Sequence, residues 1–369
     1  MRYCVLGSGL MGKAVAYDLL QQNDTELVFL IDSDEKKLNE AKVFLNNNDR
    51  LKIQNLNIAD ENNLARLLSD VDASVAAISY KFNEYITKIA IKTKTHLCDL
   101  GGNNDVVNAQ FDLHKKAEEA GISVIPDCGL APGMVSVLVK HGLEKYHWAD
   151  TVRIRVGGLP ANPKNELKYE KLFSIDGLMN EYTEPVKVLR NSQTKILAPL
   201  TEIEEIIFPE SFGRLEAFTT SGGVSTLVET YKERLKNLDY KTIRYPGHCE
   251  KLHELQKKGL FTKEYFEKEL PVCRNDSTLV KIIFEGDENK QEIVIIDKAT
   301  SNPQFTSMMR MTAFSASIIA QMQARKQINV YGVYPEEKCV PSDAFVNELK
   351  KRNVIIKGLL MICTLHLCC

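Results

Sequence analysis

The first stretch with an evident chemistry is RYCVLGSGLMG, close to the N-terminus. An apolar run meets a G-x-G-x-x-G pattern, and a helix-like segment follows. In such a turn the first glycine allows the tight bend, the second lets the backbone approach a pyrophosphate, and the third lets the helix pack against the strand. Free N–H groups and the positive end of the helix dipole then bind the phosphate. The residues of this predicted cofactor site are Gly7, Ser8, Gly9, Leu10, Met11 and Gly12.

An acid ends the next predicted strand, in LVFLIDSDE. It lies about twenty residues after the glycine turn, where a carboxylate binds the ribose 2′-hydroxyl and repels a 2′-phosphate. Asp32 therefore favours NAD over NADP as the cofactor, and no arginine follows directly to bind a 2′-phosphate. The alternative is that Asp32 only caps the helix that begins after it.

Polar side chains also follow later strands. Tyr80 comes after VAAIS, Asp99 ends THLCD, and Asp127 ends ISVIPD. In doubly wound sheets, ligands bind beyond the carboxyl ends of the strands. A carboxylate in a partly dry cleft has a raised pKa and can take a proton from an ammonium group. Each acid alone would also suit a cap of its turn, but both lie in glycine-rich loops, so we expect Asp99, Asp127 and Tyr80 to be catalytic.

Basic side chains suited to a substrate occur further along. Arg244 and His248 flank a Pro-Gly turn in RYPGHCEKL, and Arg310 lies in the otherwise apolar stretch SMMRMTAF. An arginine fork suits a carboxylate, and a histidine can relay a proton. A charge on an apolar helix must meet an acid or an anionic ligand. We assign all three to the substrate site; a surface ion pair and a packed imidazole are the alternative for Arg244 and His248.

These side chains need a scaffold that brings strand ends together. Up to about residue 126, apolar runs of strand length alternate with helix-like segments. That alternation predicts an α/β fold with a parallel, doubly wound sheet of the Rossmann type. The expected strands are Tyr3–Leu6, Leu27–Ile31, Leu51–Leu56, Ala73–Ile78, His96–Leu100 and Ser123–Pro126, and the expected helices are Gly12–Gln22, Glu35–Asn46, Glu61–Leu68, Asn83–Thr93 and Val106–Ala120.

The middle of the chain has a different pattern. Alternating strands in TVRIRVGGL, EPVKVLR, RLEAFTT, STLVKIIFEG and QEIVIIDKA predict a mixed or antiparallel sheet with one solvated face. We therefore expect residues 1–148 to form the dinucleotide-binding domain and residues 149–301 to form a second, α+β domain. A long helix predicted in PQFTSMMRMTAFSASIIAQMQAR returns the chain, so that about 302–369 completes the first domain.

Composition excludes several classes of function. The 369 residues are 44% hydrophobic and 26% charged, as in globular chains of about two domains. The basic and acidic residues nearly balance, with 47 against 49, so we expect neither nucleic-acid nor membrane binding. The nine cysteines show no Cys-x-x-Cys pair and no zinc spacing. This pattern predicts no metal site and reduced thiols, as in the cytoplasm.

The C-terminal segment VIIKGLLMICTLHLCC is apolar but too short to span a membrane. Its final Cys-Cys is not a prenylation box. We expect a buried last strand followed by a tail that activity does not need; a membrane anchor is the alternative.

Taken together, the motifs resemble the lysine 6-dehydrogenase branch of the saccharopine dehydrogenase family. The resemblance reaches about residue 355 and rests on GSGLMG, SYKFN, CDLGGNN, PDCGLAPGM, RVGGLPANP, EYTEPVKVLRNS, FGRLEAFTTSGG, RYPGHCEKL, MMRMTAFSASI and YGVYPEE. It implies NAD at the glycine turn, further cofactor contacts from Asn57 and Ser79, and a second domain for substrate binding and homodimer formation. One departure is Asn57, which stands where the family often has an acid near the adenine.

The resemblance and the candidate residues predict an NAD-dependent dehydrogenase of an amino-acid amine. The leading expectation is oxidative deamination of L-lysine at its 6-amino group, giving the semialdehyde and ammonia. Arg244 would hold the α-carboxylate, and Asp127 or Asp99 would deprotonate the amine. One alternative is oxidation of saccharopine, whose three carboxylates need several arginines. Arginines available for that role are Arg153, Arg155, Arg214 and Arg310. A catalytically silent NAD-binding sensor is a third reading, disfavoured by the presence of both acids and Arg244.

Overall fold

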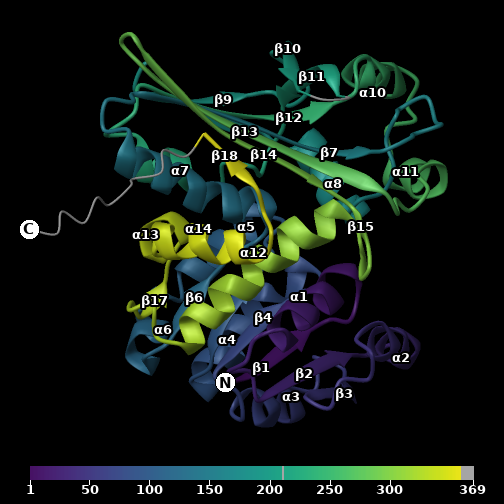
Figure 1. Cartoon of the computed structure of the whole chain (residues 1–369), viewed down its shortest axis with the longest axis vertical. Coiled ribbons are helices and arrows are strands. Elements are labelled where there is room, and N and C mark those ends of the chain that lie inside the picture. Colours follow the sequence, from purple (N-terminus) through teal and green to yellow (C-terminus); the bar gives the residue numbers. More distant parts are fainter. Residues whose placement is uncertain (210–211, 359–369) are drawn as a thin grey trace, which may run out of the picture.

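The structure is a computed structural model that describes residues 1–209 and 212–358. Figure 1 shows two domains, one above the other. The chain begins in the lower domain, builds the upper domain with its middle part, and returns between the two in a long helix. This arrangement confirms a Rossmann-like domain joined to a second domain with a mixed sheet.

The lower domain contains a parallel sheet covered by helices. Its strands are β1 Arg2–Leu6, β2 Leu27–Asp32, β3 Leu51–Asn55, β4 Ala73–Ala76, β5 His96–Asp99, β6 Ser123–Ile125 and β17 Gly332–Val333. Its first helices are α1 Leu10–Leu20, α2 Glu35–Phe44, α3 Glu61–Leu68, η1 Tyr80–Phe82, α4 Asn83–Thr93, α5 Asn104–Phe111 and α6 His114–Ala120. The strand order β17-β6-β5-β4-β1-β2-β3 reverses between β1 and β4, where doubly wound sheets bind their ligands.

The upper domain is built on a nine-stranded mixed sheet. Its strands are β7 Thr151–Pro160, β8 Val186–Arg190, β9 Gln193–Leu197, β10 Glu204–Phe208, β11 Gly213–Thr219, β12 Asn237–Arg244, β13 Asp276–Gly286, β14 Asn289–Lys298 and β18 Ile356–Lys357. Its helices are α8 Ile175–Thr183, α9 Leu227–Tyr231, α10 His248–Lys257 and α11 Lys263–Glu269. The central path runs β10-β11-β12-β7-β13-β14-β18, and only β12 and β7 pair in parallel along it. A short hairpin of β15 Thr300–Ser301 and β16 Gln304–Phe305 follows β14.

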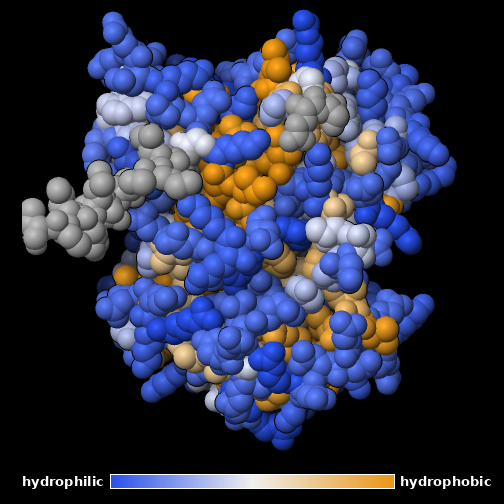
Figure 2. All heavy atoms as spheres, viewed as in Figure 1, coloured by the Kyte–Doolittle hydropathy of each residue, from blue (hydrophilic) through white to orange (hydrophobic). Residues whose placement is uncertain are grey.

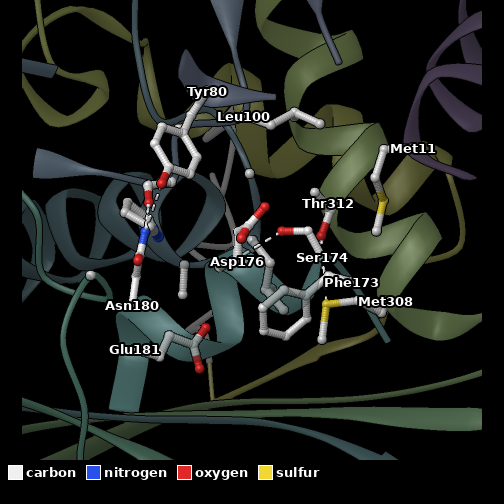
Figure 3. Close-up of a pocket in the computed structure, with 18 of the residues that line it drawn as sticks. Met11, Tyr80, Leu100, Phe173, Ser174, Asp176, Asn180, Glu181, Met308 and Thr312 are labelled. Atoms are coloured by element: carbon white, nitrogen blue, oxygen red, sulfur yellow. Dashed lines mark hydrogen bonds between the residues drawn. The ribbon is translucent and has the colours of Figure 1, made fainter. Parts of the chain in front are cut away.

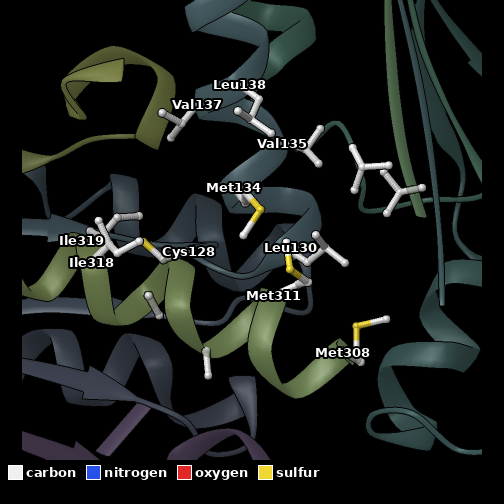
Figure 4. Close-up of a cluster of buried hydrophobic side chains, with 14 of the residues drawn as sticks. Cys128, Leu130, Met134, Val135, Val137, Leu138, Met308, Met311, Ile318 and Ile319 are labelled. Carbon is white, nitrogen blue, oxygen red and sulfur yellow. The ribbon is translucent and has the colours of Figure 1, made fainter. Parts of the chain in front are cut away.

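A shared apolar core joins the two domains. The remaining helices are η2 Leu130–Met134, α7 Val135–Lys145, α12 Ser307–Ala324, α13 Glu336–Cys339 and α14 Ser342–Lys351. Helix α12 packs on α1, β4 and β5 of the first domain and also on β13 and β14 of the second. Figure 4 shows its side chains meeting those of η2 and α7. The labelled members are Cys128, Leu130, Met134, Val135, Val137, Leu138, Met308, Met311, Ile318 and Ile319.

A buried polar cluster anchors the end of the chain to the first domain. The Asp18 carboxylate on α1 accepts hydrogen bonds from Ser317 Oγ (2.7 Å) and Gln321 Nε2 (3.1 Å) of α12, and from Arg352 Nε (2.8 Å) after α14. The last described strand, β18, instead pairs with β14 of the second sheet. The expected last strand is therefore present, but residues after 302 contribute to both sheets. The tail beyond residue 358 lies outside the described part of the chain.

Local patterns missed some elements. The helix predicted over Val106–Ala120 is split into α5, which ends at Phe111, and α6, which begins at His114. Leu113, between them, is buried in an apolar cluster, and its ψ of 3° departs from that of an α-helix. Strands β9, β10 and β12 were not predicted; the exposed β9 carries no core-facing apolar pattern, and β12 carries Asp239, Lys241 and Arg244 in buried positions. Charged residues in a buried strand hide it from a pattern based on hydrophobicity.

The second sheet has an apolar outer face. In Figure 2 an apolar area appears on the upper domain where Figure 1 places β13, β14 and β18. An apolar cluster on this side of the sheet joins Phe208, Ile243 and Leu279 with the partly buried Val294 and Ile296.

Within the described residues, no helix combines the length and apolarity that a membrane crossing requires, and no three His, Cys, Asp or Glu side chains gather as a metal site.

Candidate active site

A cavity of about 650 Å³ lies between the carboxyl ends of the first sheet and the second domain. The first domain contributes the glycine turn and the loops after β4, β5 and β6. The second domain contributes β7, β12 and α8, and α12 closes one side. Figure 3 shows Tyr80 and Leu100 from the first domain, Asn180 and Glu181 from α8, and Met308 from α12 around this space.

The glycine turn has the shape that a dinucleotide requires. A Cβ atom at Gly7 would lie 2.6 Å from the Ala77 carbonyl oxygen, and one at Gly12 would lie 1.8 Å from the Gly7 oxygen. These positions admit only glycine because strand, turn and helix touch there. A Cβ at Gly9 would meet nothing within 4 Å and would instead occupy the cavity. The N-terminus of α1 has no side-chain cap, so its N–H groups are available to a phosphate.

Asp32 lines the cavity, and three hydrogen bonds hold its carboxylate. Its Oδ2 accepts hydrogen bonds from Ser8 N (2.8 Å) and Ser8 Oγ (3.0 Å), and its Oδ1 accepts one from Asp34 N (3.0 Å). Partial burial opposes ionisation, but these hydrogen bonds outweigh it and lower the Asp32 pKa. The ionised side chain lines the cavity, and Lys37 is another of the lining residues.

The other expected cofactor residues divide into two groups. Leu10, Met11 and Ser79 line the cavity together with Gly7 and Gly9. Asn57 does not, because it is exposed and its Oδ1 accepts a hydrogen bond from Ala59 N (3.0 Å). The adenine contact expected of Asn57 therefore has no support in its placement.

Asp127 is a cavity acid held in an unusual conformation. It is 4% exposed, its φ is 65°, and its Oδ2 accepts a hydrogen bond from Ser225 Oγ in the second domain (2.5 Å). Gly101 lies so close that a Cβ there would be 1.7 Å from Asp127 Oδ1. Burial raises the pKa of Asp127 to about 7, with contributions from the nearby acids Asp99 and Glu337. Such a carboxylate suits a general base near neutral pH.

Asp99 occupies a different place from the one expected. It is fully buried and does not line the cavity. Its Oδ1 accepts hydrogen bonds from Gly101 N (2.8 Å) and Asp127 N (3.3 Å), and its Oδ2 accepts one from Gln110 Nε2 (2.8 Å). Asp99 therefore holds the loop that carries Asp127 from outside the cavity lining, and this placement does not support the expected catalytic role.

Arg244 faces the cavity from the end of β12, and a chain of hydrogen bonds holds it. It is 3% exposed; its Nε donates to Tyr182 Oη (3.0 Å), and its guanidinium lies over the Tyr169 ring at 4.6 Å. His248 Nδ1 donates to the Leu167 carbonyl (2.6 Å), so its Nε2 accepts from Tyr182 Oη (3.0 Å). Burial and the Arg244 charge lower the His248 pKa to about 3.

The placement of His248 and Arg310 does not support the expected role of either as a substrate ligand. Neither lines the cavity. His248 is a neutral support behind Tyr182, and Arg310 pairs with Asp297 (3.2 Å), the acid that its apolar helix required. Tyr80 does line the cavity, where its Oη accepts a long hydrogen bond from Asn180 Nδ2 (3.4 Å).

Helix α8 and its C-terminal cap residue, Glu184, supply acids that the sequence analysis did not single out. Asp176, Glu181 and Glu184 all line the cavity. Burial raises the Glu181 pKa to about 7, although the nearby Arg244 opposes the shift. Glu184 accepts hydrogen bonds from Asn103 Nδ2 (3.1 Å) and Ser221 Oγ (3.4 Å). The motif EYTEPVKVLR contained two of these residues, but nothing local showed that they would face the first domain.

The other arginines proposed for a polyanionic substrate are engaged elsewhere. Arg153 pairs with Glu285 (3.0 Å), and Arg155 pairs with Asp239 (2.6 Å) on the second sheet. Arg214 is exposed and lies 3.4 Å from Glu205. Within the described residues, Arg244 is the one arginine that lines the cavity.

Comparison with known proteins matches both halves of the chain. The family model described as the saccharopine dehydrogenase NADP binding domain matches residues 3–125, and the model of the saccharopine dehydrogenase C-terminal domain matches residues 129–355. The Schizosaccharomyces pombe saccharopine dehydrogenase [NADP(+), L-glutamate-forming] is 25% identical over 321 residues, which are 82% of this chain and 67% of that protein. The mitochondrial alpha-aminoadipic semialdehyde synthase of Rattus norvegicus is 24% identical over 71% of this chain, which spans only 28% of that longer protein.

A solved structure confirms the fold. Apo saccharopine dehydrogenase (L-Glu forming) from Saccharomyces cerevisiae superimposes with a TM-score of 0.77 at 16% identity, covering 97% of this chain and 100% of the other. The glycine turn and the cavity residues thus lie in a matching two-domain architecture. The chain belongs to the saccharopine dehydrogenase family, and its first domain is the nicotinamide-dinucleotide-binding domain of that family.

Proposed function

We propose that the chain is an NAD-dependent amino-acid dehydrogenase that oxidises L-lysine at its 6-amino group, giving the semialdehyde and ammonia. The observation that carries this proposal is the charge of the substrate end of the cavity. Four acids, Asp127, Asp176, Glu181 and Glu184, face this space with a single arginine, Arg244, among its described lining residues. That balance suits a substrate with one carboxylate and two ammonium groups.

The same balance disfavours a polyanionic substrate. Each carboxylate taken out of water needs a cation or several hydrogen-bond donors to offset its desolvation. Saccharopine has three carboxylates, and the remaining arginines considered for it are paired outside the cavity. Lysine needs one such partner, and its distal ammonium gains from the acids.

The residues divide the chemistry between them. Arg244 binds the α-carboxylate through its free guanidinium edge. Asp127, with a pKa of about 7, takes a proton from the 6-ammonium so that a neutral amine can lose hydride. When bound, NAD supplies the oxidant that accepts this hydride from the carbon bearing the amine. Water then adds to the iminium carbon, and the C–N bond breaks to leave the aldehyde and ammonia.

Oxidation of saccharopine is the second candidate. It is favoured by the names of the relatives, which are saccharopine dehydrogenases that form L-glutamate. The reaction breaks the same kind of C–N bond after hydride removal, with glutamate as the leaving amine instead of ammonia. The cavity would then have to hold its extra carboxylates with backbone N–H groups and lysine side chains.

Product analysis separates the candidates. The purified chain is incubated with NAD or NADP and with L-lysine or saccharopine, and reduced cofactor, ammonia and glutamate are measured. We expect reduced NAD with an equal amount of ammonia from L-lysine. Glutamate from saccharopine would instead support the second candidate. Tight NAD binding without oxidation of either amine would overturn both and favour a sensor.

We also propose a homodimer that buries the apolar outer face of the second sheet. Light scattering of the purified protein is expected to give the mass of two chains. Replacing Ile296 by lysine should give the mass of one chain, because it places a charge within the apolar cluster of this face. Val43, an exposed apolar residue of the first domain, provides the control, since Val43→Lys should leave the dimer intact. A single-chain mass for the unmodified protein would contradict the proposal.

The cytoplasm is the proposed compartment. The described cysteines are free, buried thiols. A chain without disulfide bonds among its described residues suits a reducing environment, and fractionation of source cells tests the placement.

A further inference from the structure

We infer that Glu181 and Arg244 form a clamp for the head group of a free α-amino acid, with Arg244 on the carboxylate and Glu181 on the α-ammonium. The inference rests on the proposed amine dehydrogenase function and specifies what the other end of the substrate must be. It predicts that the enzyme recognises an unblocked α-amino acid and oxidises an amine at the far end of its side chain.

The first support is the way in which Arg244 is held. Its Nε donates to Tyr182 Oη (3.0 Å) and its Nη1 to the Ile243 carbonyl (2.9 Å), so the guanidinium is fixed from behind. Its Nη2 lies 3.8 Å from Glu181 Oε2, which is an ion-pair distance but too long for a hydrogen bond. A guanidinium that is 3% exposed therefore still has donors for an anion.

Three cavity carboxylates come from α8 and its C-cap, and within the described residues Glu181 is the one whose side chain accepts no hydrogen bond. Glu184 accepts from Asn103 and Ser221, and Asp176 pairs with Lys263 at 2.7 Å. The side chain of Glu181 is 25% exposed and points into the cavity in Figure 3. A partly buried carboxylate in this state gains most from an incoming ammonium group.

The spacing of the two groups matches an amino-acid head. The carboxylate and ammonium of an α-amino acid share one carbon, so their receptors must be neighbours. Glu181 and Tyr182 are consecutive on α8, and Tyr182 holds Arg244, so the acid and the guanidinium are placed by the same turn of helix. Asp127 lines the same cavity but comes from the other domain, where it follows β6, so we assign it to the distal amine.

A comparison of two substrates tests the clamp. L-Lysine carries both head groups, whereas 6-aminohexanoate has the same distal amine and the carboxylate but no α-amine. Glu181→Gln should lower kcat/KM for L-lysine by about tenfold or more, mainly through KM, because it removes a charge-assisted hydrogen bond. The same variant should leave kcat/KM for 6-aminohexanoate within about twofold, whereas Arg244→Lys should lower it for both substrates.

Glu184→Gln, at the residue that caps the C-terminus of α8, is the matched control. Because Glu184 is held by Asn103 and Ser221, this change should alter kcat/KM for the two substrates by the same factor. An equal loss for both substrates in Glu181→Gln, or no loss for L-lysine, would overturn the clamp.

The clamp and the proposed function fail in different ways. If the unmodified chain oxidises neither substrate, the proposed function is wrong. Calorimetric titration with L-lysine and 6-aminohexanoate then still tests the clamp, because Glu181→Gln must weaken binding of L-lysine and not of 6-aminohexanoate. Absence of L-lysine binding to the unmodified chain would overturn the clamp as well.

Discussion

Asp127→Asn is expected to lower the turnover number for the amine substrate by about a hundredfold or more, the usual contribution of a general base, while NAD binding persists. Asparagine has nearly the same size and can still accept the Ser225 hydrogen bond through its amide oxygen. It cannot take a proton, so the substrate amine stays an ammonium group and cannot lose hydride. The prediction thus isolates the chemistry of one side chain with little change in its surroundings.

The pH dependence provides a second measurement on the same residue. Because the base must be ionised, turnover should rise as the pH increases through about 7, the pKa of Asp127. Burial raises that pKa first, and Asp99 and Glu337 add to the shift, whereas the Ser225 hydrogen bond lowers it. Ser225→Ala should therefore move the acid limb of the kcat profile to higher pH. Glu337→Gln removes a nearby negative charge and should move it to lower pH.

Asp99→Asn is the control for general damage to this loop. Asp99 lies outside the cavity but accepts the Gly101, Asp127 and Gln110 hydrogen bonds, so its loss should lower thermal stability more than turnover of the folded enzyme. Kinetics at saturating substrate and NAD titration by fluorescence give the needed values. Unchanged turnover in Asp127→Asn would remove Asp127 from the mechanism.

The first domain was predictable because its signals are local. The glycine turn and Asp32 lie at the ends of adjacent strands, and the apolar runs of β1, β2, β4, β5 and β6 each mark a buried parallel strand. The family resemblance, which both family models confirm, rests on the same short motifs. The sequence therefore contained the fold class and the dinucleotide-binding domain.

The substrate site was harder because it forms only when two domains meet. Ser225 donates a hydrogen bond to Asp127, and Glu181 lies beside Arg244. The two members of each pair are far apart in the sequence, so no local pattern connects them. Burial also changes what a residue type means: His248 resembles a proton relay in the sequence, but its pKa of about 3 and its two partners make it a neutral support. Chemical type alone could not separate Asp99 from Asp127, since only one of them reaches the cavity.

Asp32→Asn is expected to reverse much of a preference for NAD over NADP. The unmodified carboxylate should accept a hydrogen bond from the ribose 2′-hydroxyl and repel the 2′-phosphate of NADP. Losing one charge-assisted hydrogen bond costs about 1.5–3 kcal/mol, or about ten- to a hundredfold in NAD affinity. The amide also removes the repulsion, and the nearby Lys37 becomes available to a phosphate, so NADP affinity should rise.

Two observations make this experiment decisive for the cofactor. The matching family model and several relatives carry NADP in their names, whereas Asp32 lines the cavity and its carboxylate is expected to oppose a 2′-phosphate. The hydrogen bonds from Ser8 and Asp34 lower the Asp32 pKa, so the carboxylate stays charged at neutral pH and the repulsion persists across the working range.

Asp34→Asn is the matched control, with the same change of charge two residues away. Asp34 caps α2 by accepting a hydrogen bond from Lys37 N (3.1 Å), and asparagine caps a helix equally well. Because Asp34 is outside the cavity lining, its loss should leave the ratio of kcat/KM values for NAD and NADP within about threefold, whereas Asp32→Asn should change that ratio by about a hundredfold. An unmodified chain that prefers NADP would show that Lys37 and the backbone, and not the Asp32 carboxylate, decide which ribose is bound.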